Sequence, residues 1–502
     1  MPNPLYDSLL APGRHSDRTF LTDIHGKPLS YRDFHRLAAR QANALVSAGL
    51  VPGDRLAVQV EKTPEALALY AACVMAGIVF LPLNTAYTLT ELDYFITDSG
   101  ARAVVCGPAI EAELKARCST AVSVFTLDGE GNGTLSELAE RQSSDIAVAA
   151  RTEGDLAALL YTSGTTGRSK GAMLTHANLL SNAKTLAELW HFDADDVLLH
   201  ALPIFHTHGL FVACNVTLTA QASMIFLPKF DLAAMLRLMP RATVLMGVPT
   251  FYTRLLNDER FNRDLVAHMR LFISGSAPLL AETHIEFEAR TGHRILERYG
   301  MTETNMSVSN PYDGERRAGT VGFPLPDVEL KITDLETGAS LAPGEPGMIE
   351  VRGPNVFQGY WGMPEKTKAE LRDNGFFITG DIGRVDEDGY VQIVGRAKDL
   401  IISGGLNIYP REIELFLDEQ PDVLESAVVG VPHPDFGEAV LAFIVARPGT
   451  TPDLAAISQK AMQNLARFKQ PRELIQLDEL PRNTMGKVQK ASLRQSFQDR
   501  FL

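Results

Sequence analysis

Short apolar runs alternate with longer helical patterns through residues 50–300, and this alternation constrains the fold most strongly. The segments RLAVQV, DLAALLYT and MRLFISG are typical of buried strands, whereas HANLLSNAKTLAELW and LLAETHIEFEARTG are typical of helices. Strands that alternate with helices form parallel sheets with helices packed on their faces. We therefore predict an α/β fold for the large N-terminal part of the chain.

The pattern of apolar and turn-forming residues changes twice after residue 300. From about Gly319 to Val394, short strands separated by Gly and Pro turns predict a β-rich subdomain. After residues 395–399, helical segments such as LAAISQKAMQNLARFK (454–469) and strand-like segments such as AVLAFIVA predict a small α+β module. We expect an N-terminal domain over 1–394, its β-rich subdomain at about 319–394, and a C-terminal domain over 395–502, with the boundary near residues 394–399.

Composition restricts the class of partner. The 502 residues carry a formal net charge of −14, which disfavours nucleic-acid binding, since that requires a basic face. The uncharged stretch Ala66–Leu83 contains Gly77 and Pro82 and predicts a buried helix, a turn and a strand rather than a membrane span. The N-terminus lacks a signal-type apolar core, and the four cysteines lack metal-ligand spacing. We expect a cytoplasmic protein without stable membrane association.

The segment Tyr161–Gly171, YTSGTTGRSKG, has the composition of a phosphate-binding loop. Gly164 and Gly167 allow tight turns that point backbone N–H groups at an anion, and Lys170 adds a positive charge. It is not a Walker A loop, because position 169 is serine where that motif needs glycine. A solvated linker is the alternative, but the strand-like runs on both sides favour phosphate binding.

This segment resembles the signature of the adenylate-forming superfamily, which includes acyl-CoA synthetases, peptide-synthetase adenylation domains and beetle luciferases. Four further segments match its other motifs in order, over nearly the whole chain: Tyr299–Thr304 (YGMTET), Thr379–Asp381 (TGD), Gly395–Pro410 (GRAKDLIISGGLNIYP) and Pro481–Lys487 (PRNTMGK). The resemblance implies an enzyme that uses ATP and Mg²⁺ to convert a carboxylic acid into its acyl-adenylate and then transfers the acyl group to coenzyme A.

Adenylation must hold a carboxylate and an α-phosphate in line despite their repulsion, and it must stabilise the departing pyrophosphate. By resemblance, Lys487 bridges the two anions, Thr302 and Glu303 complete the catalytic set, and Glu303 and Thr162 serve the Mg²⁺ ion. The residues that the resemblance assigns to ATP are Thr162, Ser163, Gly164, Thr165, Thr166, Gly167, Lys170, Ser276, Ala277, Tyr299, Thr302, Asp381 and Arg396.

Three other positions follow from the same resemblance. Lys398 occupies the hinge position of the family, here within residues 395–399, so the resemblance implies a mobile C-terminal domain that docks in two orientations. Gly404 and Gly405 would let the coenzyme A thiol arm pass close to the backbone. Because Lys487 must carry a free ammonium, its acetylation by a lysine acetyltransferase is expected to silence the enzyme, and a deacetylase to restore it.

Arg298, directly before YGMTET, indicates the acid. An arginine in an acyl pocket is uncompensated unless the substrate supplies a second carboxylate. The combination ERYG with IFHTHG (204–209) is similar to malonyl-CoA synthetases, which implies malonate or methylmalonate. The acyl-pocket candidates are His206, Ser276, Arg298, Met301 and Arg254. The alternative is that Arg298 pairs with Glu297 or another carboxylate, although neighbours on a strand point to opposite faces.

Competing functions share the first half-reaction. A stand-alone adenylation enzyme would load a carrier protein instead of coenzyme A, and another CoA ligase would take a different short acid. A luciferase-like oxygenase would emit light with a luciferin. A non-catalytic nucleotide-binding module would bind ATP without releasing pyrophosphate.

Overall fold

The computed structural model describes residues 2–162, 169–403, 406–483 and 487–502. Contacts within the chain divide it into two compact units. The first comprises Met1–Leu279, Thr283–Glu329 and Val351–Phe377, and the second comprises Leu280–Glu282, Leu330–Glu350 and Ile378–Leu502. This division groups residues 330–350 and 378–394 of the predicted β-rich segment with the C-terminal residues, and a domain boundary near 394–399 stays a prediction.

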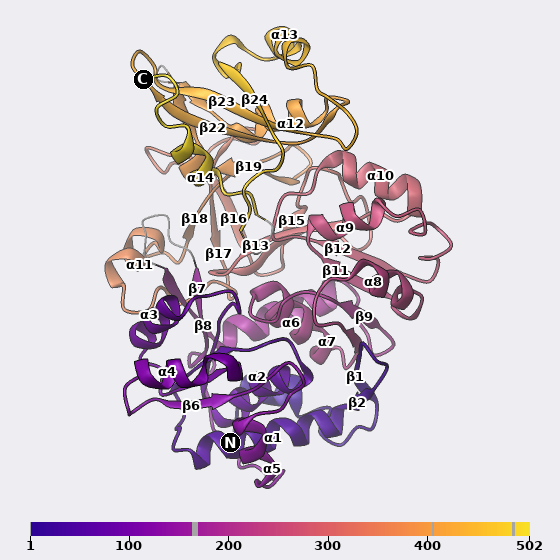
Figure 1. Cartoon of the computed structure of the whole chain (residues 1–502), viewed down its shortest axis with the longest axis vertical. Helices are drawn as coiled ribbons and strands as arrows, with labels where there is room; N and C mark the ends of the chain where they lie inside the picture. Colours follow the sequence, from indigo (N-terminus) through magenta and orange to yellow (C-terminus); the bar gives the residue numbers. More distant parts are fainter. Residues whose placement is uncertain (1, 163–168, 404–405, 484–486) are drawn as a thin grey trace. The chain divides into compact units, whose positions relative to one another are not determined.

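A six-stranded sheet forms in the first unit, in the order β6-β5-β3-β4-β7-β8 (Figure 1). The strands from β6 to β7 run parallel, and β8 returns antiparallel to β7. Their bounds are Arg55–Gln59 (β3), Val79–Pro82 (β4), Ala103–Cys106 (β5), Ser123–Thr126 (β6), Leu156–Thr162 (β7) and Lys170–Thr175 (β8).

A nine-stranded sheet also belongs to the first unit, in the order β15-β14-β13-β12-β11-β9-β10-β1-β2. The strands from β13 to β1 are parallel, and antiparallel strands close both edges. Their bounds are Thr19–Asp23 (β1), Pro28–Ser30 (β2), Val197–His200 (β9), Ser223–Phe226 (β10), Val244–Gly247 (β11), Leu271–Ser274 (β12), Leu296–Met301 (β13), Asn305–Ser309 (β14) and Phe323–Pro324 (β15).

Helices cover these sheets, as expected for parallel strands joined by crossovers. The core beside β3, β4 and β5 is made of fully apolar side chains that include Leu81, Phe95 and Val104. The α-helices of the first unit are Tyr31–Ser47 (α1), Pro64–Ala76 (α2), Leu89–Ser99 (α3), Glu111–Arg117 (α4), Thr134–Glu140 (α5), His176–Leu189 (α6), Asn215–Thr219 (α7), Leu232–Leu238 (α8), Pro249–Leu256 (α9) and Pro364–Glu370 (α11); α10 is Ala281–Thr291.

The remaining strands form two smaller sheets. Strands Glu329–Thr333 (β16), Gly347–Arg352 (β17), Phe377–Val385 (β18) and Val391–Arg396 (β19) follow one another in sequence order. The last sheet has the order β21-β20-β23-β22, with β24 beside β23. Its strands are Ile401–Ser403 (β20), Leu406–Ile408 (β21), Val423–His433 (β22), Gly437–Ala446 (β23) and Glu473–Leu477 (β24).

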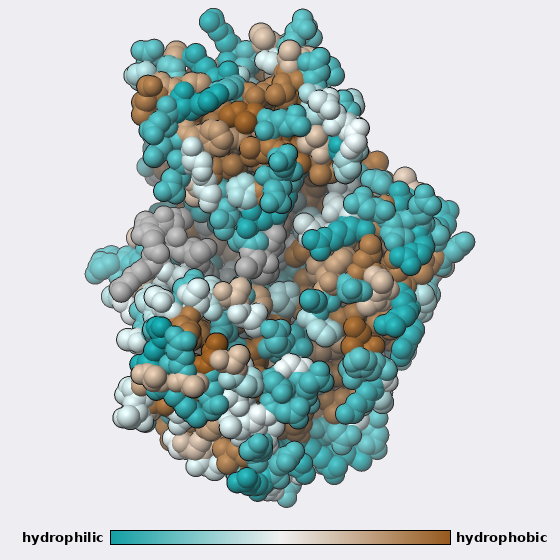
Figure 2. Space-filling model, viewed as in Figure 1, coloured by the Kyte–Doolittle hydropathy of each residue, from teal (hydrophilic) through white to brown (hydrophobic). Residues whose placement is uncertain are grey.

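The last sheet carries helices on both faces. Alternate residues of β22 and β23 pack against Pro410–Asp418 (α12) and Leu454–Asn464 (α13) on one face, and against Lys490–Ser496 (α14) on the other. Figure 2 shows hydrophobic residues on the surface of this region. Phe436 and Met462 are two exposed hydrophobic residues of this part of the chain. The predicted fold class is confirmed: a large α/β part with parallel sheets, a β-rich part and an α+β C-terminal part.

Of two local predictions, one is confirmed and the other is wrong. The uncharged stretch 66–83 forms helix α2, a left-handed Gly77 and strand β4, as predicted. The helix expected over 454–469 was wrong in length, because α13 ends at Asn464 and Arg467–Lys469 form a separate 3₁₀ turn. Leu465 leaves the helical region and packs against the core under the sheet, so tertiary packing overrides helix propensity there. None of the helices within the described residues has the length and apolar character needed to cross a membrane.

Gly77 provides a test of the turn. Its φ is +70°, and a Cβ there would lie 2.8 Å from Arg151 Nε and 3.1 Å from Ala149 Cβ. Gly49 has a φ of +93° with nothing within 4 Å of such a Cβ, so it is the matched control. Gly77→Ala is expected to reduce the free energy of unfolding by about 1–3 kcal/mol more than Gly49→Ala, because it adds crowding to the same backbone strain. Equal losses in urea unfolding would contradict this packing.

Candidate active site

Arg298 lies in the middle of β13, opposite Ser309 of β14, and its side chain turns into the protein with only 3% of its surface exposed. The guanidinium lies against Gly275, at the end of β12. A Cβ at Gly275 would be 2.4 Å from Arg298 Cζ, so a glycine is required for the side chain to pass. Two elements distant in sequence therefore shape one buried position.

The guanidinium of Arg298 has no protein counter-charge in the part of the chain that the structure describes. Its Nε and Nη2 atoms are buried there without a hydrogen-bond partner, and no ion pair joins it to a described carboxylate. Burial lowers the pKa of Arg298 to about 9. An unpaired charge in a protein interior is strongly unfavourable, so this position is suited to an anion that arrives from outside.

His208 faces the same position. Burial, and then the charge of Arg298, lower the pKa of His208 well below its usual value, so the imidazole is neutral. Its Nδ1 lies 3.2 Å from Ser276 Oγ, and its Nε2 is buried without a partner among the described residues. Ser276 has a φ of +70°, a conformation that costs a residue with a side chain roughly 1–3 kcal/mol and is concentrated at functional sites.

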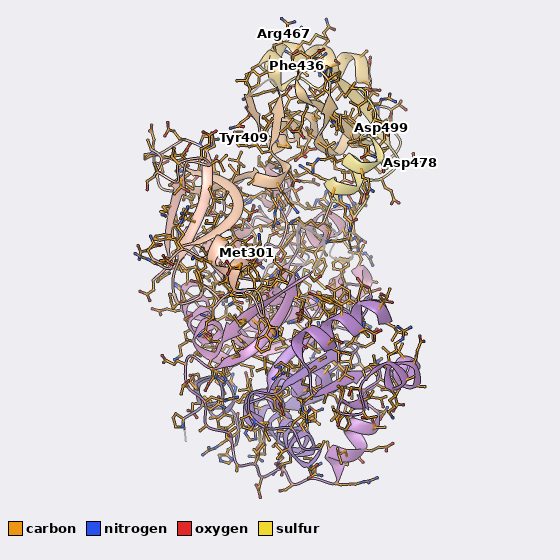
Figure 3. All side chains as sticks on the ribbon, turned by 90° about the vertical axis from the view of Figure 1, so that its left-hand side faces the viewer. Met301, Tyr409, Phe436, Arg467, Asp478 and Asp499 are labelled. Carbon is orange, nitrogen blue, oxygen red and sulfur yellow. The ribbon has the colours of Figure 1, made fainter. Side chains whose placement is uncertain are left out.

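The structure thus brings together two of the predicted acyl-pocket residues, Arg298 and Ser276, and adds His208. Met301 ends β13, three residues beyond Arg298 (Figure 3), and His206 lies two residues before His208, whose pKa it lowers. Arg254 is exposed on α9 with its guanidinium 5.6 Å from the centre of the Phe230 ring. No described contact joins Arg254 to Arg298, so its role stays a prediction.

A second cluster surrounds Glu303, the predicted Mg²⁺ ligand. Glu303 is 4% exposed, and burial raises the pKa of its carboxyl. The Tyr360 hydroxyl lies 3.0 Å from Glu303 Oε1 and 2.6 Å from Glu370 Oε2. The Lys170 ammonium lies 3.4 Å from Glu370 Oε2 and 4.1 Å from the centre of the Tyr360 ring. Lys170 is therefore held beside Glu303 at the beginning of β8, which pairs with β7 at Thr162.

These residues fit a Mg²⁺ ion that ATP phosphates hold in part. Mg²⁺ prefers one or two carboxylates together with phosphate and water oxygens. Within the described residues, no three His, Cys, Asp or Glu side chains gather as a metal cage. A single buried carboxylate at Glu303 meets the requirement, and Thr302 and Tyr299 precede it in the same motif, both half-buried.

The second unit carries the remaining candidates. Asp381 of β18 pairs in register with Arg396 of β19, and Arg396 Nε lies 3.0 Å from Asp381 Oδ1. Desolvation, and then the charge of Arg396, lower the pKa of Lys487 to about 8. The Lys487 residue itself is exposed. Lys398 lies exposed in the 3₁₀ turn Ala397–Asp399 (η5) and adds to the same field.

The predictions for the two glycine-bearing loops cannot be placed. Ser163, Gly164, Thr165, Thr166 and Gly167 of the phosphate loop, and Gly404 and Gly405 of the coenzyme A passage, lie outside the described residues. Ala277 follows Ser276 and is half-buried.

Sequence reasoning missed His208, Tyr252 and Ser274. The segment IFHTHG contains two histidines, His206 and His208, and the sequence does not indicate which of them faces Arg298. Ser274 Oγ is buried without a partner in the described chain, and the Tyr252 hydroxyl donates to Ile273 O at 2.5 Å. Tyr252 affects the pKa of Arg298, so its ring lies near the guanidinium. Only the fold brings these positions together.

Comparison with known proteins agrees with this arrangement. The family model described as AMP-binding enzyme matches residues 11–361, and the AMP-binding enzyme C-terminal domain matches residues 412–487. The chain belongs to the AMP-binding enzyme family. The predicted resemblance to the adenylate-forming superfamily is confirmed.

Several relatives and solved structures are similar over most of their length. The malonate–CoA ligase of Arabidopsis thaliana is 36% identical, over 90% of this chain and 79% of the relative. The mitochondrial malonate–CoA ligase of Bos taurus is 32% identical, over 95% and 88%. The ATP-bound crystal structure of MatB from Rhodopseudomonas palustris is 57% identical, covers 100% of both chains and has a TM-score of 0.98.

These matches show the chemistry at the level of the family. The chain is a CoA ligase, and it uses ATP, Mg²⁺ and coenzyme A. A feruloyl-CoA synthase of an Amycolatopsis species is also 36% identical, over 94% of both chains. Sequence identity to these relatives therefore does not select the acid, and the side chains of the pocket must do so.

The unpaired state of Arg298 makes a prediction about stability. Arg298→Met removes a buried charge that lacks a described partner, so it is expected to raise the free energy of unfolding of the ligand-free protein by about 1–4 kcal/mol. Arg270→Met is the matched control, because Arg270 donates to buried Asp196 at 2.7 and 2.5 Å. That change is expected to lower stability by about 3 kcal/mol. Destabilisation by both changes would show that Arg298 has a counter-charge.

Proposed function

We propose that this protein is a malonate–CoA ligase, which activates malonate as its acyl-adenylate and transfers the malonyl group to coenzyme A. The observation that carries the proposal is the buried guanidinium of Arg298, which has no carboxylate partner among the described residues. Malonate is small and has two carboxylates. One can react while the other neutralises the arginine.

The charge of the pocket disfavours other acids. A monocarboxylic acid uses its one carboxylate for the reaction and leaves Arg298 desolvated and unpaired. Arginine binds carboxylates through two parallel N–H donors, and its unpartnered Nε and Nη2 offer such a pair. The neutral His208 adds Nε2 as a further polar contact. Methylmalonate differs from malonate by one methyl group, worth about 1–3 kcal/mol in a pocket, and it is the nearest alternative substrate.

The relatives support this choice of acid. Two of the similar proteins are malonate–CoA ligases, from a plant and from a mammal. Feruloyl-CoA synthases and a long-chain-fatty-acid–CoA ligase of Bacillus subtilis reach comparable identity, so the relatives alone leave several acids open. The guanidinium favours malonate among them, since neither a feruloyl group nor a fatty acyl chain supplies a second carboxylate to an acyl pocket.

The reaction divides into two balanced steps. A carboxylate oxygen attacks the α-phosphorus of ATP, an O–P bond forms, and the bond to pyrophosphate breaks. The thiol sulfur of coenzyme A then attacks the acyl carbon, its proton passes to solvent, and the bond to AMP breaks. Mg²⁺, when bound, offsets the negative charge of the phosphates.

We assign roles to the candidate residues on this scheme. Lys487 stabilises the two anions as they approach, and Glu303 with Thr162 serves the metal. Asp381 and Arg396, which form an ion pair 3.0 Å long, contact the ribose. The remaining nucleotide contacts come from Thr302, Lys170, Tyr299, Ser276, Ala277 and the phosphate loop 163–167. Lys398 serves as the hinge between a domain over 1–394 and one over 395–502, and Gly404 and Gly405 line the coenzyme A passage.

Lys487 is also proposed as a point of control. It is exposed, and its pKa of about 8 leaves a fraction of neutral amine near physiological pH, the form that reacts with acyl donors. Acetylation would remove the charge that adenylation needs. A lysine acetyltransferase and a deacetylase are the partners that this proposal implies.

Arg298→Ala tests the choice of acid. The variant is expected to lose about 100-fold or more in kcat/KM for malonate, because a charged contact made in a buried pocket is removed. Its loss with propionate is expected to be far smaller. Pyrophosphate release across mono- and dicarboxylic acids, with and without coenzyme A, measures both. Arg241→Ala, at an exposed arginine, is the matched control. Equal losses with both acids would remove Arg298 from the pocket.

Lys487→Ala tests the adenylation step. Loss of one preorganised donor is expected to lower the rate of pyrophosphate release about 100- to 1,000-fold, while ATP binding measured by calorimetry stays nearly unchanged. Lys490 is an unsuitable control because its ammonium lies 2.5 Å from buried Glu414. Lys460→Ala is the better one, since Lys460 is exposed on α13. A near-normal rate in Lys487→Ala would exclude its role.

A further inference from the structure

Lys62 is a buried lysine with no role in the reaction described above. It lies between β3 and α2 and is 8% exposed. Its Nζ atom lies 2.8 Å from His200 Nδ1, 3.0 Å from His200 O and 4.2 Å from the centre of the Phe226 ring. No ion pair joins Lys62 to a carboxylate in the described ranges. A lysine buried in this way is retained for its hydrogen bonds rather than for an ion pair.

His200 links Lys62 to Gly209 through its second ring nitrogen. It ends β9, and its Nε2 lies 2.8 Å from Gly209 O. A carbonyl oxygen only accepts, so Nε2 carries the proton and Nδ1 accepts from Lys62. Burial, and then the charge of Lys62, lower the pKa of His200 well below its usual value, which keeps the ring in this neutral form. Lys62 therefore supports the tautomer of His200 that donates to Gly209 O.

Gly209 lies in the first turn of a π-helix, His208–Cys214 (η3), whose first residue is His208. The Gly209 carbonyl also accepts from Cys214 Sγ at 3.2 Å. A Cβ at Gly209 would lie 2.0 Å from Pro203 O, so the backbone here is closely packed. π-Helices are rare and often occur at functional sites. The contact from His200 fixes the turn that presents His208.

We infer that Lys62 and His200 are positioning residues that hold the first turn of η3, so that His208 faces Arg298 and the pocket prefers a dicarboxylic over a monocarboxylic acid. The inference rests on the proposed function. Neither residue is expected to touch the substrate. Both act through Gly209 O on the adjacent His208.

The hydrogen bonds from Lys62 to His200 and from His200 to Gly209 explain why an apolar side chain at position 62 would not hold His208 in place. Without a donor at position 62, His200 Nδ1 and His200 O would be buried without their present partner, which is unfavourable in a protein interior. The imidazole could then exchange tautomers or rotate, and the hydrogen bond to Gly209 would be lost. His208 would keep its place in the sequence but lose its fixed orientation toward Arg298.

Lys62→Met tests the inference, because methionine fills the same space beside Phe226 without a donor. The ratio of kcat/KM for malonate to that for propionate is expected to fall about tenfold, the size of one lost buried hydrogen bond. KM for ATP is expected to stay within about twofold of wild type, since that site is not involved. Lys184→Met, at an exposed lysine on α6, is the matched control. A role limited to stability would lower the unfolding temperature and leave the ratio unchanged, which would overturn the inference.

A double variant tests whether Lys62 acts through His208. If it does, Lys62→Met combined with His208→Ala should have the same acid ratio as His208→Ala alone, because residues coupled in one network are not additive. Independent, additive losses would contradict the inference. If Lys62→Met does not fold, His200→Met replaces it, since methionine fills a similar space but cannot donate to Gly209 O. An unchanged acid ratio in that variant would also overturn the inference.

The same assays separate the two levels of the proposal. If the wild-type enzyme shows no preference for malonate over propionate, the proposed function fails. If the wild type prefers malonate and Lys62→Met keeps that preference in full, only the positioning role fails.

Discussion

A buried guanidinium, with no counter-charge among the residues that the structure describes, is the feature on which this site depends. Water stabilises a free charge far better than a protein interior does, so a fold carries this arrangement at a cost to its own stability. Around Arg298, Gly275 leaves the space that the side chain occupies, and His208 is kept neutral. Each of these features makes sense if an anion completes the position during the reaction.

The parallel sheet explains how the residues meet. The carboxyl ends of neighbouring parallel strands lie along one edge, where ligands bind in open α/β sheets. Strand β9 ends at His200, β12 ends at Ser274, and Arg298 comes from β13 in the same sheet. The segments that follow β9 and β12 depart from regular structure: one forms a π-helix, and the other contains Ser276 at a φ of +70°. The regular strands fix the position, and the irregular segments aim the side chains.

Much of this could be predicted from the sequence, because the signals are local. Alternating apolar runs predicted the parallel sheets, and Gly77 predicted the turn between α2 and β4. Arg298 stood out because it adjoins a recognisable motif. The partners of Arg298 could not be predicted in the same way. His208 and His206 are two residues apart in one segment, and only the π-helix determines which of them approaches Ser276 Oγ.

Lys62 shows the same limit more clearly. Lysine is usually a surface residue, and 138 positions separate Lys62 from His200, its hydrogen-bond partner. Likewise, helix α13 is shorter than predicted because Leu465 packs against the core, a tertiary contact that helix propensity does not indicate. The residues that carry the chemistry lie in short sequence motifs, whereas the orientation of their side chains depends on tertiary contacts.

The most direct test compares malonate with malonamate, in which an amide of nearly the same size replaces the second carboxylate. If Arg298 awaits a second negative charge, kcat/KM for malonate should exceed that for malonamate by about 100-fold or more, as expected for a buried charged contact. Equal specificity constants for the two acids would contradict the account.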